Sequence, residues 1–276
     1  MQLHCGTFQL DLSRPLVMGI INVTPDSFSD GGQHLQYVDA LVHAQNLISE
    51  GADLLDIGGE STRPGALPVS VQQEMDRVLP VIEGLRGAPV PISIDTCKPE
   101  VMCAAIAAGA QMVNDVDALR DAAAMHAIAS SNVAVCLMHK QGDPQTMQAQ
   151  PDYRNVVAEV GEFLRQRIAA AEAAGIPRNR IVIDPGFGFG KTLEHNLALL
   201  RELKNLAELG VPILAGLSRK SMLGALTGRE VGERVAASVA AALIAVQRGA
   251  RIVRVHDVRE TVDALKIWNV INENKS

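Results

Sequence analysis

Residues 17–23 read VMGIINV, and residues 24–32 directly after them read TPDSFSDGG. The first stretch is a short apolar run, which is typical of a strand in a parallel sheet that is covered on both faces. The second stretch is polar and rich in glycine, so this strand ends in a loop suited to binding or chemistry. The same succession of an apolar run and a polar end recurs along the chain, and it decides the fold.

Seven further apolar runs follow the first, and helical patterns fill the intervals between them. The helical pattern is clear over 71–85, where apolar residues step by three and four, and Ser70 with Gln73 forms a capping-box start. A similar stripe covers 258–271, with Asp257 and Glu260 at its start. The seven runs are 54–57, 92–94, 112–113, 134–138, 181–183, 213–217 and 252–255.

Glycines stand shortly before several of these runs, where helices usually end. They are Gly51, Gly109, Gly175, Gly210 and Gly249.

Eight strand–helix units in a chain of 276 residues match the usual size of a (β/α)8 barrel. We therefore predict an α/β fold, a TIM barrel that forms a single domain over residues 1–276. The first fifteen residues are expected to form a short extension that closes the bottom of the barrel. An open doubly wound sheet is the alternative, but it usually needs a Gly-x-Gly-x-x-Gly turn after the first strand, which this sequence lacks.

Composition narrows the class of protein. Hydrophobic residues make up 47% of the chain and charged residues 20%, so a large core is expected. The net charge of -6 gives no reason to expect a nucleic-acid or membrane partner. Four scattered cysteines without a C-x-x-C pair, and an N-terminus without a signal-peptide pattern, indicate a cytoplasmic protein.

Polar residues follow each of the eight runs, at the strand ends where (β/α)8 barrels place their catalytic groups. Each one has an ordinary structural explanation when it is taken alone: Asp95, Asn114 or Asp184 could cap a helix, and Lys220 could be a solvated loop lysine. Their convergence on one basin favours a binding site instead. The residues at the ends of runs three to eight are Asp95, Asn114, Asp115, His139, Asp184, Ser218, Arg219, Lys220, Arg254 and His256.

The charges of this set suggest two kinds of ligand group. Two buried carboxylates and an amide suit a flat heterocycle with adjacent N–H donors, and a lysine suits its carbonyl oxygen. Met138, Phe187 and Phe189 offer apolar surface to the faces of a ring. Neutral and cationic donors suited to an anion are Asn22, Arg63, Arg219, Arg254 and His256.

At these residues the chain closely resembles the bacterial dihydropteroate synthases. The two longest matching segments are 18–32, MGIINVTPDSFSDGG, and 56–65, DIGGESTRPG. The resemblance covers roughly residues 10–270, and its shorter segments are 95–96, 113–115, 137–139, 184–191, 218–221 and 254–257.

The resemblance implies that 6-hydroxymethyl-7,8-dihydropterin diphosphate and p-aminobenzoate condense to 7,8-dihydropteroate and diphosphate, in folate biosynthesis. The residues that it implies for the pterin are Asp95, Asn114, Val116, Met138, Asp184, Phe189, Gly216, Lys220 and Arg254. For the diphosphate they are Asn22, Arg63, Arg254 and His256, with Asn22 also a ligand of Mg2+. For p-aminobenzoate they are Phe28, Thr62, Arg63, Pro64, Ser218, Lys220 and Ser221. The resemblance also implies a homodimer formed through helices in the C-terminal half.

The mechanism that we expect is dissociative and SN1-like, because a neutral arylamine is already nucleophilic and loss of diphosphate is the harder step. Mg2+, Arg254 and His256 would stabilise the leaving charge, and Asp95 and Asp30 the pterin cation. The catalytic residues implied are thus Asp95, Asp30, Lys220 and Arg254.

Two residues depart from the family pattern, Asp117 after the fourth run and Lys140 after His139. The first loop carries no insertion of the kind seen in sulfonamide-insensitive relatives, so ordinary competition between sulfonamides and p-aminobenzoate is expected.

Three other functions are weighed against this one. A domain that presents methylated folate to a corrinoid partner would keep Asp95, Asn114 and Asp184 but would not need the loop residues at 28, 62–63 and 218–220. A metal-dependent hydrolase would use His139 and His256, yet it wants clustered histidines such as His-x-His. A scaffold role leaves the charges on the loops without a purpose.

Overall fold

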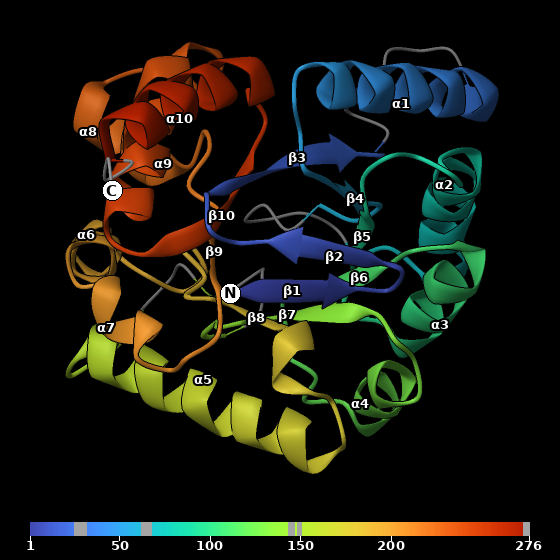
Figure 1. Ribbon diagram of the computed structural model, residues 1–276, viewed down its shortest axis with the longest axis horizontal. Coiled ribbons are helices and arrows are strands. Elements are labelled where there is room, and N and C mark those ends of the chain that lie inside the picture. Colours follow the sequence, from blue (N-terminus) through green and yellow to red (C-terminus); the bar gives the residue numbers. More distant parts are fainter. Residues whose placement is uncertain (25–31, 62–67, 143–146, 148–150, 273–276) are drawn as a thin grey trace.

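The computed structural model describes residues 1–24, 32–61, 68–142, 147 and 151–272. Eight parallel strands form a closed barrel in the order β10-β3-β4-β5-β6-β7-β8-β9, as the sequence predicts (Figure 1). The strands are β3 (Leu16–Asn22), β4 (Leu54–Gly58), β5 (Ile92–Asp95), β6 (Met112–Asp115), β7 (Ala134–Met138), β8 (Ile181–Asp184), β9 (Ile213–Ala215) and β10 (Ala250–Val255).

Each barrel strand is followed by a helix, and the helices form an outer ring (Figure 1). The five longest of the described helices are α1 (Gly32–Ser49), α2 (Val71–Gly84), α5 (Val156–Ala173), α9 (Val235–Gln247) and α10 (Val258–Asn272). The others are α3 (Pro99–Ala108), α4 (Ala122–Ala129), α6 (Leu193–Arg201), α7 (Lys204–Ala207) and α8 (Ser221–Thr227).

The helix ends agree with the local sequence signals. The capping box at α2 is present, with the Ser70 hydroxyl accepting from the backbone of Gln73 and the Gln73 side chain accepting from that of Ser70. All five glycines expected at helix ends have the positive φ that only glycine adopts without strain.

The N-terminal hairpin closes one end of the barrel. Strands β1 (Gln2–Cys5) and β2 (Phe8–Asp11) pair antiparallel and lie across the barrel opening (Figure 1). Leu3 and Cys5 of β1 are fully buried and pack against the first inward side chains of the barrel, among them Met18, Leu54 and Met112. The predicted extension that closes the bottom of the barrel is therefore confirmed.

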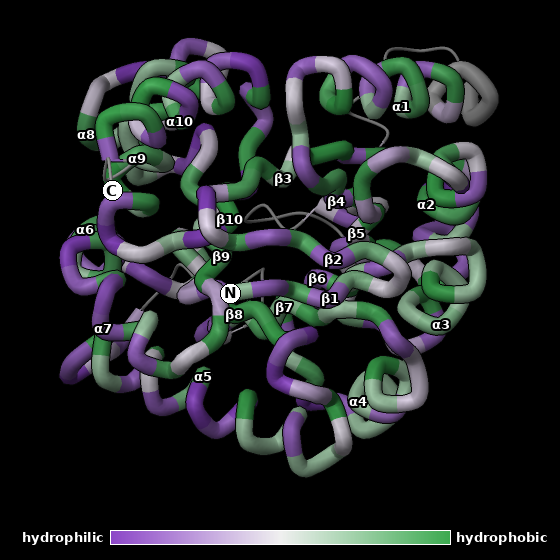
Figure 2. Tube along the Cα trace, in the orientation of Figure 1, coloured by the Kyte–Doolittle hydropathy of each residue, from purple (hydrophilic) through white to green (hydrophobic). Residues whose placement is uncertain are grey.

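Hydrophobic and hydrophilic residues are distributed differently in the barrel strands and in the outer helices. The strands are mostly hydrophobic, whereas the outer helices alternate between hydrophilic and hydrophobic residues along their length (Figure 2). No described helix is long and apolar enough to span a bilayer. The four cysteines are free thiols.

Candidate active site

The polar residues inside the barrel lie beyond the apolar cluster that the N-terminal hairpin forms with the strands, toward the C-terminal ends of the strands. Because alternate residues of a strand point to the same face, the residue two positions after each inward apolar side chain also points inward. Leu54 is thus followed by Asp56, Met112 by Asn114, and Val182 by Asp184. The same step leads from Leu214 to Gly216 and from Ile252 to Arg254. The C-terminal ends of the strands therefore bring these residues to one basin, as the sequence predicts.

Arg254 lies at the centre of this layer and binds two carboxylates. Its Nε donates to Oδ2 of Asp56 at 2.5 Å, and its Nη2 donates to Oδ2 of Asp95 at 2.8 Å. Although burial acts in the other direction, the charges of Asp56 and Asp95 raise the pKa of Arg254 above its ordinary value. The guanidinium is therefore held in place and charged at every physiological pH.

Asp56 is the functional residue that sequence reasoning missed. It is fully buried, and its Oδ2 also accepts a hydrogen bond from Nδ2 of Asn114 at 3.0 Å, while Oδ1 has no hydrogen-bond partner. A signal was present in the sequence, because an aspartate within the apolar run LLDIG must point either into the barrel or into the helix layer. The bond from Asn114 directs its amide donor to Asp56, so the amide oxygen is left to accept from a ligand.

Asp184 and Gly216 shape the opposite wall of the basin. Oδ1 of Asp184 accepts from the backbone N–H of Gly186 at 2.7 Å. A Cβ added at Gly216 would stand 3.8 Å from Oδ2 of Asp184 and 4.0 Å from Cβ of Arg254, so this glycine leaves the space between them open. Val116 directly follows β6 and Met138 is the last residue of the neighbouring strand β7, and both side chains are buried.

Lys220 reaches the basin from the loop after β9. Its ammonium donates to the carbonyl oxygen of Phe187 and lies 4.6 Å from the centre of the Phe189 ring. The Phe187 ring is fully buried within the core, so the expectation that it offers its face to a ligand is wrong. Phe189 is half-buried beside Lys220 and remains the aromatic residue available to a ring.

The anion-binding candidates lie at neighbouring strand ends. A Cβ at Gly58 would stand 3.9 Å from both Oδ1 of Asn22 and Oδ2 of Asp95, so these two side chains flank the same glycine. His256 contacts Ser218 through Nδ1 at 2.9 Å. Ser221 is the exposed first residue of α8.

Arg219 binds a neighbouring carboxylate and stabilises the loop after β9. Its guanidinium binds the carboxylate of Asp257, with Nε 3.1 Å from Oδ2, and its backbone has a positive φ of 57°. A non-glycine residue in this left-handed region is uncommon and costs free energy, which the Asp257 pair helps to offset.

Five of the predicted site residues lie outside the described residues. They are Phe28, Asp30, Thr62, Arg63 and Pro64.

Burial shifts the ionisation of the basin in a consistent way. It raises the pKa of Asp95 to about 7, although Arg254 acts in the opposite direction. It also raises the pKa of Asp184, which Lys220 opposes, and it lowers the pKa of Lys220 to about 8, which Asp184 opposes. Groups with pKa values displaced toward neutrality by burial and by a nearby charged partner are typical of an active site.

His139 has a structural partner. Its Nδ1 lies 3.0 Å from Nζ of Lys191, and its ring packs edge-on against Phe163 with centroids 4.9 Å apart. Burial, and then the charge of Lys191, lower its pKa to about 3. Lys191 occupies one of the two ring nitrogens of His139, and the described residues contain no group of three or more His, Cys, Asp or Glu that could hold a metal ion. The clustered ligands that the hydrolase interpretation requires are therefore not found in the described part of the chain.

The two residues that depart from the family pattern bind each other. Nζ of Lys140 lies 2.6 Å from Oδ1 of Asp117. The pair joins the loop after β6 to the loop after β7.

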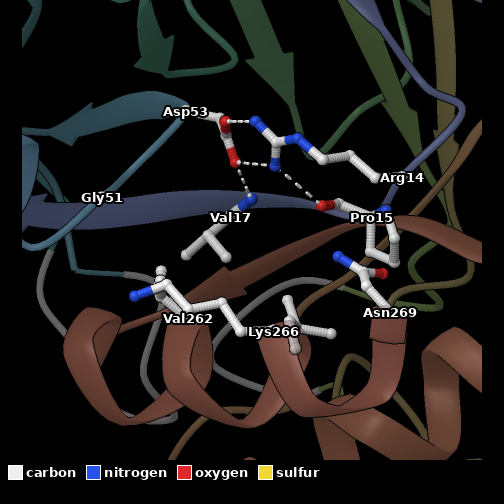
Figure 3. Close-up of a pocket in the computed structure, with 9 residues that line it drawn as sticks. Arg14, Pro15, Val17, Gly51, Asp53, Val262, Lys266 and Asn269 are labelled. Atoms are coloured by element: carbon white, nitrogen blue, oxygen red, sulfur yellow. Dashed lines mark hydrogen bonds and ion pairs between the residues drawn. The ribbon is translucent and has the colours of Figure 1, made fainter. Parts of the chain in front are cut away.

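A pocket at the other end of the barrel is a weaker candidate for the active site than this basin. It lies between the start of β3 and α10, and two of its charged side chains, Arg14 and Asp53, bind each other (Figure 3). Arg14 binds the carboxylate of Asp53, whose Oδ2 also accepts from the backbone N–H of Val17 at 2.9 Å.

Comparison with known proteins agrees with this geometry. Residues 18–256 match the family described as pterin binding enzyme. The chain is 49% identical over 268 residues to the dihydropteroate synthase of Escherichia coli (strain K12), covering 97% of this chain and 95% of that protein. The chain belongs to the dihydropteroate synthase family.

Other dihydropteroate synthases are at least as similar. That of Neisseria meningitidis serogroup B is 53% identical over 278 residues, covering 98% of both proteins. The structure of the Xanthomonas albilineans dihydropteroate synthase with 4-aminobenzoic acid matches with a TM-score of 0.93 and 57% identity, covering 99% of this chain and 98% of that one. Another structure of that enzyme contains 7,8-dihydropteroate.

Membership of the dihydropteroate synthases makes this chain an enzyme, a transferase. The resemblance inferred from the motifs is confirmed, and the corrinoid-partner alternative is not favoured.

Proposed function

We propose that the basin binds 6-hydroxymethyl-7,8-dihydropterin diphosphate and joins its exocyclic carbon to the amine of p-aminobenzoate, releasing diphosphate. The observation that carries this proposal is that Asp95, Asn114 and Asp184 lie at the C-terminal ends of β5, β6 and β8, with Lys220 in the loop after β9. Two carboxylates, an amide oxygen and an ammonium match the donors and the carbonyl oxygen along the edges of a pterin.

Each of these residues has a distinct task in the proposal. Asp184 accepts from the N3–H and the 2-amino group, because a carboxylate fits two adjacent donors. Asn114 accepts from a ring N–H through its oxygen, since its amide nitrogen donates to Asp56. Lys220 donates to the ring carbonyl, while Val116, Met138 and Phe189 contact the ring faces.

Asn22, His256 and Arg254 would hold the diphosphate, and Arg63 would join them. The p-aminobenzoate pocket would be formed by Phe28, Thr62, Pro64, Ser218 and Ser221, with Arg63 and Lys220 at its border. Most of this pocket lies outside the described residues, so its assignment depends on the sequence resemblance.

The donor set fits a magnesium ion bound mainly through the substrate. Asn22 offers a single neutral oxygen, whereas the nearby Oδ2 of Asp95 already accepts from Arg254. Mg2+ keeps several waters and commonly takes one or two protein oxygens with phosphate oxygens, and it would neutralise charge on the leaving diphosphate. Asn22 is the residue that would hold it.

The residues support a dissociative path. No general base is needed to activate a neutral arylamine, and the Arg254 guanidinium carries a fixed positive charge toward the leaving diphosphate. Asp95, and Asp30 from the first loop, would stabilise the pterin cation that forms as the C–O bond breaks. The amine nitrogen then bonds to the exocyclic carbon and loses its proton to water.

The test is release of diphosphate from the pterin substrate, measured with and without p-aminobenzoate and with and without Mg2+. We expect release to require both the pterin substrate and Mg2+, with dihydropteroate formed only when p-aminobenzoate is present. Asp184→Asn should raise the KM for the pterin more than that for p-aminobenzoate. Turnover that is unaffected by chelation of divalent ions would overturn the metal assignment.

Sulfonamides should compete with p-aminobenzoate in this enzyme. A Yersinia pestis dihydropteroate synthase, 50% identical over 98% of this chain, has been solved as a sulfonamide drug complex. Inhibition should therefore be relieved by added p-aminobenzoate, and activity that persists at saturating drug would contradict the prediction.

A cytoplasmic homodimer is also part of the proposal. Exposed apolar side chains on the two C-terminal helices support self-association, because single copies rarely leave such groups together in water. They are Ile244 of α9 and Ile267, Val270 and Ile271 of α10. The four free thiols agree with a reducing compartment.

A further inference from the structure

We infer that Lys191 is a positioning residue that acts on the pterin site through the loop 186–190 and Lys220. The inference rests on the proposed function of the basin and adds to it a residue whose own side chain is buried outside it.

The ammonium of Lys191 is buried and has an acceptor for each of its three protons. Nζ lies 2.9 Å from the carbonyl oxygen of Gly186, 3.0 Å from that of Phe189 and 3.0 Å from Nδ1 of His139. The carbonyl of His139 is a longer contact at 3.4 Å. Because a buried cation without partners is strongly unfavourable, this arrangement has to persist for the protein to fold well.

The loop that Lys191 holds cannot keep its shape by local preference. Gly186, Gly188 and Gly190 all have positive φ, and glycine is the most flexible residue in an unfolded chain. A Cβ at Gly186 would overlap the carbonyl of His139, and one at Gly190 would overlap the carbonyl of Gln141. The loop is therefore pressed against the end of β7, and Lys191 links its first and fourth residues to that strand.

The same loop determines where Lys220 lies. The carbonyl oxygen of Phe187 accepts from the Lys220 ammonium, and the Phe189 ring lies 4.6 Å from it. Phe187 lies between two residues that are held in place: Lys191 binds the carbonyl oxygen of Gly186, and Oδ1 of Asn196 accepts from the N–H of Gly188 at 2.8 Å. Lys191 also binds the carbonyl oxygen of Phe189 itself. Any change in the carbonyls of Gly186 and Phe189 thus moves both groups that position Lys220.

Burial shifts the ionisation of both Lys191 and His139. Burial lowers the pKa of Lys191 to about 7, with Asp184 acting in the opposite direction and Lys220 in the same one. His139 stays neutral at physiological pH and accepts at Nδ1, because burial and Lys191 lower its pKa to about 3. No proton transfer to substrate is required of either residue.

The variant Lys191→Met keeps an unbranched side chain, one atom shorter than lysine, and removes its donors. We expect the KM for the pterin diphosphate to rise about tenfold, since hydrogen bonds from a charged group are lost, while the KM for p-aminobenzoate changes less than about threefold. The decisive measurement is a double-mutant cycle with Lys220→Met, using calorimetric affinity for 6-hydroxymethylpterin. If Lys191 acts through Lys220, its substitution should cost less than about threefold in the Lys220→Met background.

Arg180→Met is the matched control. Arg180 is a buried cation that holds three backbone carbonyls, those of Ile128, Ser131 and Val133, at 2.7–2.9 Å near the opposite end of the barrel. The Arg180→Met variant should lower thermal stability about as much as Lys191→Met does, and it should leave the KM for the pterin within about twofold of the wild type. A similar pterin defect in both variants would show that Lys191 has only a structural role.

A second variant covers the case in which Lys191→Met does not fold. Asn196→Ala frees the N–H of Gly188 in the same loop, and its effect on pterin affinity should also shrink in the Lys220→Met background. Fully additive losses in both cycles would overturn the inference. Because the wild-type enzyme is assayed alongside for diphosphate release, failure of the proposed function would appear separately, as inactivity of the wild type.

Discussion

Arg254 is the residue that pairs with two of the carboxylates of the basin. It binds Asp56 and Asp95 at once, so one of its partners is fully buried within β4 and the other lies at the C-terminal end of β5. This arrangement explains how Asp95 can be held in position next to a cation and still have its pKa raised by burial to about 7. Ionisation of single residues should therefore control activity near neutral pH.

Asp95 and Lys220 should give kcat/KM a bell-shaped pH dependence. Asp95 must be ionised to stabilise a pterin cation, so activity falls as the pH drops through about 7. Lys220 must be protonated to donate, and burial lowers its pKa to about 8, so activity falls again above that pH. Steady-state rates of wild type and Asp95→Asn across this range check the prediction.

The Asp95→Asn variant should lose the acid limb, and its kcat should fall about a hundredfold while its pterin affinity falls about tenfold or less. Equal losses in turnover and in binding would count against an electrostatic role in the transition state.

Gly216 provides a test of where the pterin lies. Its backbone needs no glycine, and an added Cβ meets only ordinary contacts, so Gly216→Val should fold. The two further methyl groups would enter the space between Asp184 and Arg254, and the KM for the pterin should rise more than about tenfold. Gly216→Ala is the control and should have a much smaller effect; an unchanged KM in both variants would place the ligand elsewhere.

At the scale of elements, the site depends on how neighbouring strand–helix units are tied together. Lys98, in the turn before α3, binds both Glu60, after β4, and Glu74 of α2. Oε1 of Glu60 accepts in turn from the N–H of Val69 at 2.9 Å, so one carboxylate joins the two sides of the second loop. The Asp117–Lys140 pair joins the loops after β6 and β7 in the same manner.

The Asp117–Lys140 pair should behave as one unit. We expect a coupling free energy of about 1 kcal/mol between Asp117→Asn and Lys140→Met, the upper end for a pair that is partly exposed to solvent. Urea unfolding of the two single variants and the double variant measures it. Because the pair borders Val116 and Met138, the pterin KM of the single variants should rise no more than about threefold; strictly additive stabilities would show that the contact contributes nothing.

At the scale of the whole molecule, the barrel is closed at one end by the hairpin β1–β2 and carries its site at the other. The exposed apolar residues of α9 and α10 are none of the residues proposed for the site. We therefore predict that self-association and catalysis can be separated by mutation.

Replacement of Val270 and Ile271 by Asp should dissociate the proposed homodimer, because two buried charges per subunit would face an apolar interface. Sedimentation velocity measures the change. Val42→Asp, at an exposed apolar position of α1, is the control and should leave the assembly unchanged. A wild-type chain that sediments as a monomer at micromolar concentration would overturn the dimer.

That all 276 residues act as one domain stays a prediction. It implies a single cooperative unfolding transition by both circular dichroism and intrinsic fluorescence of Trp268 in the C-terminal helix. Two separated transitions would contradict it.

The sequence by itself determined the eight strands, the start of α2 and the polar strand ends, because each depends on local periodicity or on a capping signal within a few residues. Only the tertiary structure decided that Asp56 binds Arg254, 198 residues away, and that Asp117 meets Lys140. It also decided that Phe187 contributes its carbonyl and not its ring, and that His139 accepts from Lys191. Such contacts arise when the barrel closes, since closure alone fixes which inward side chains of distant strands stand at the same level.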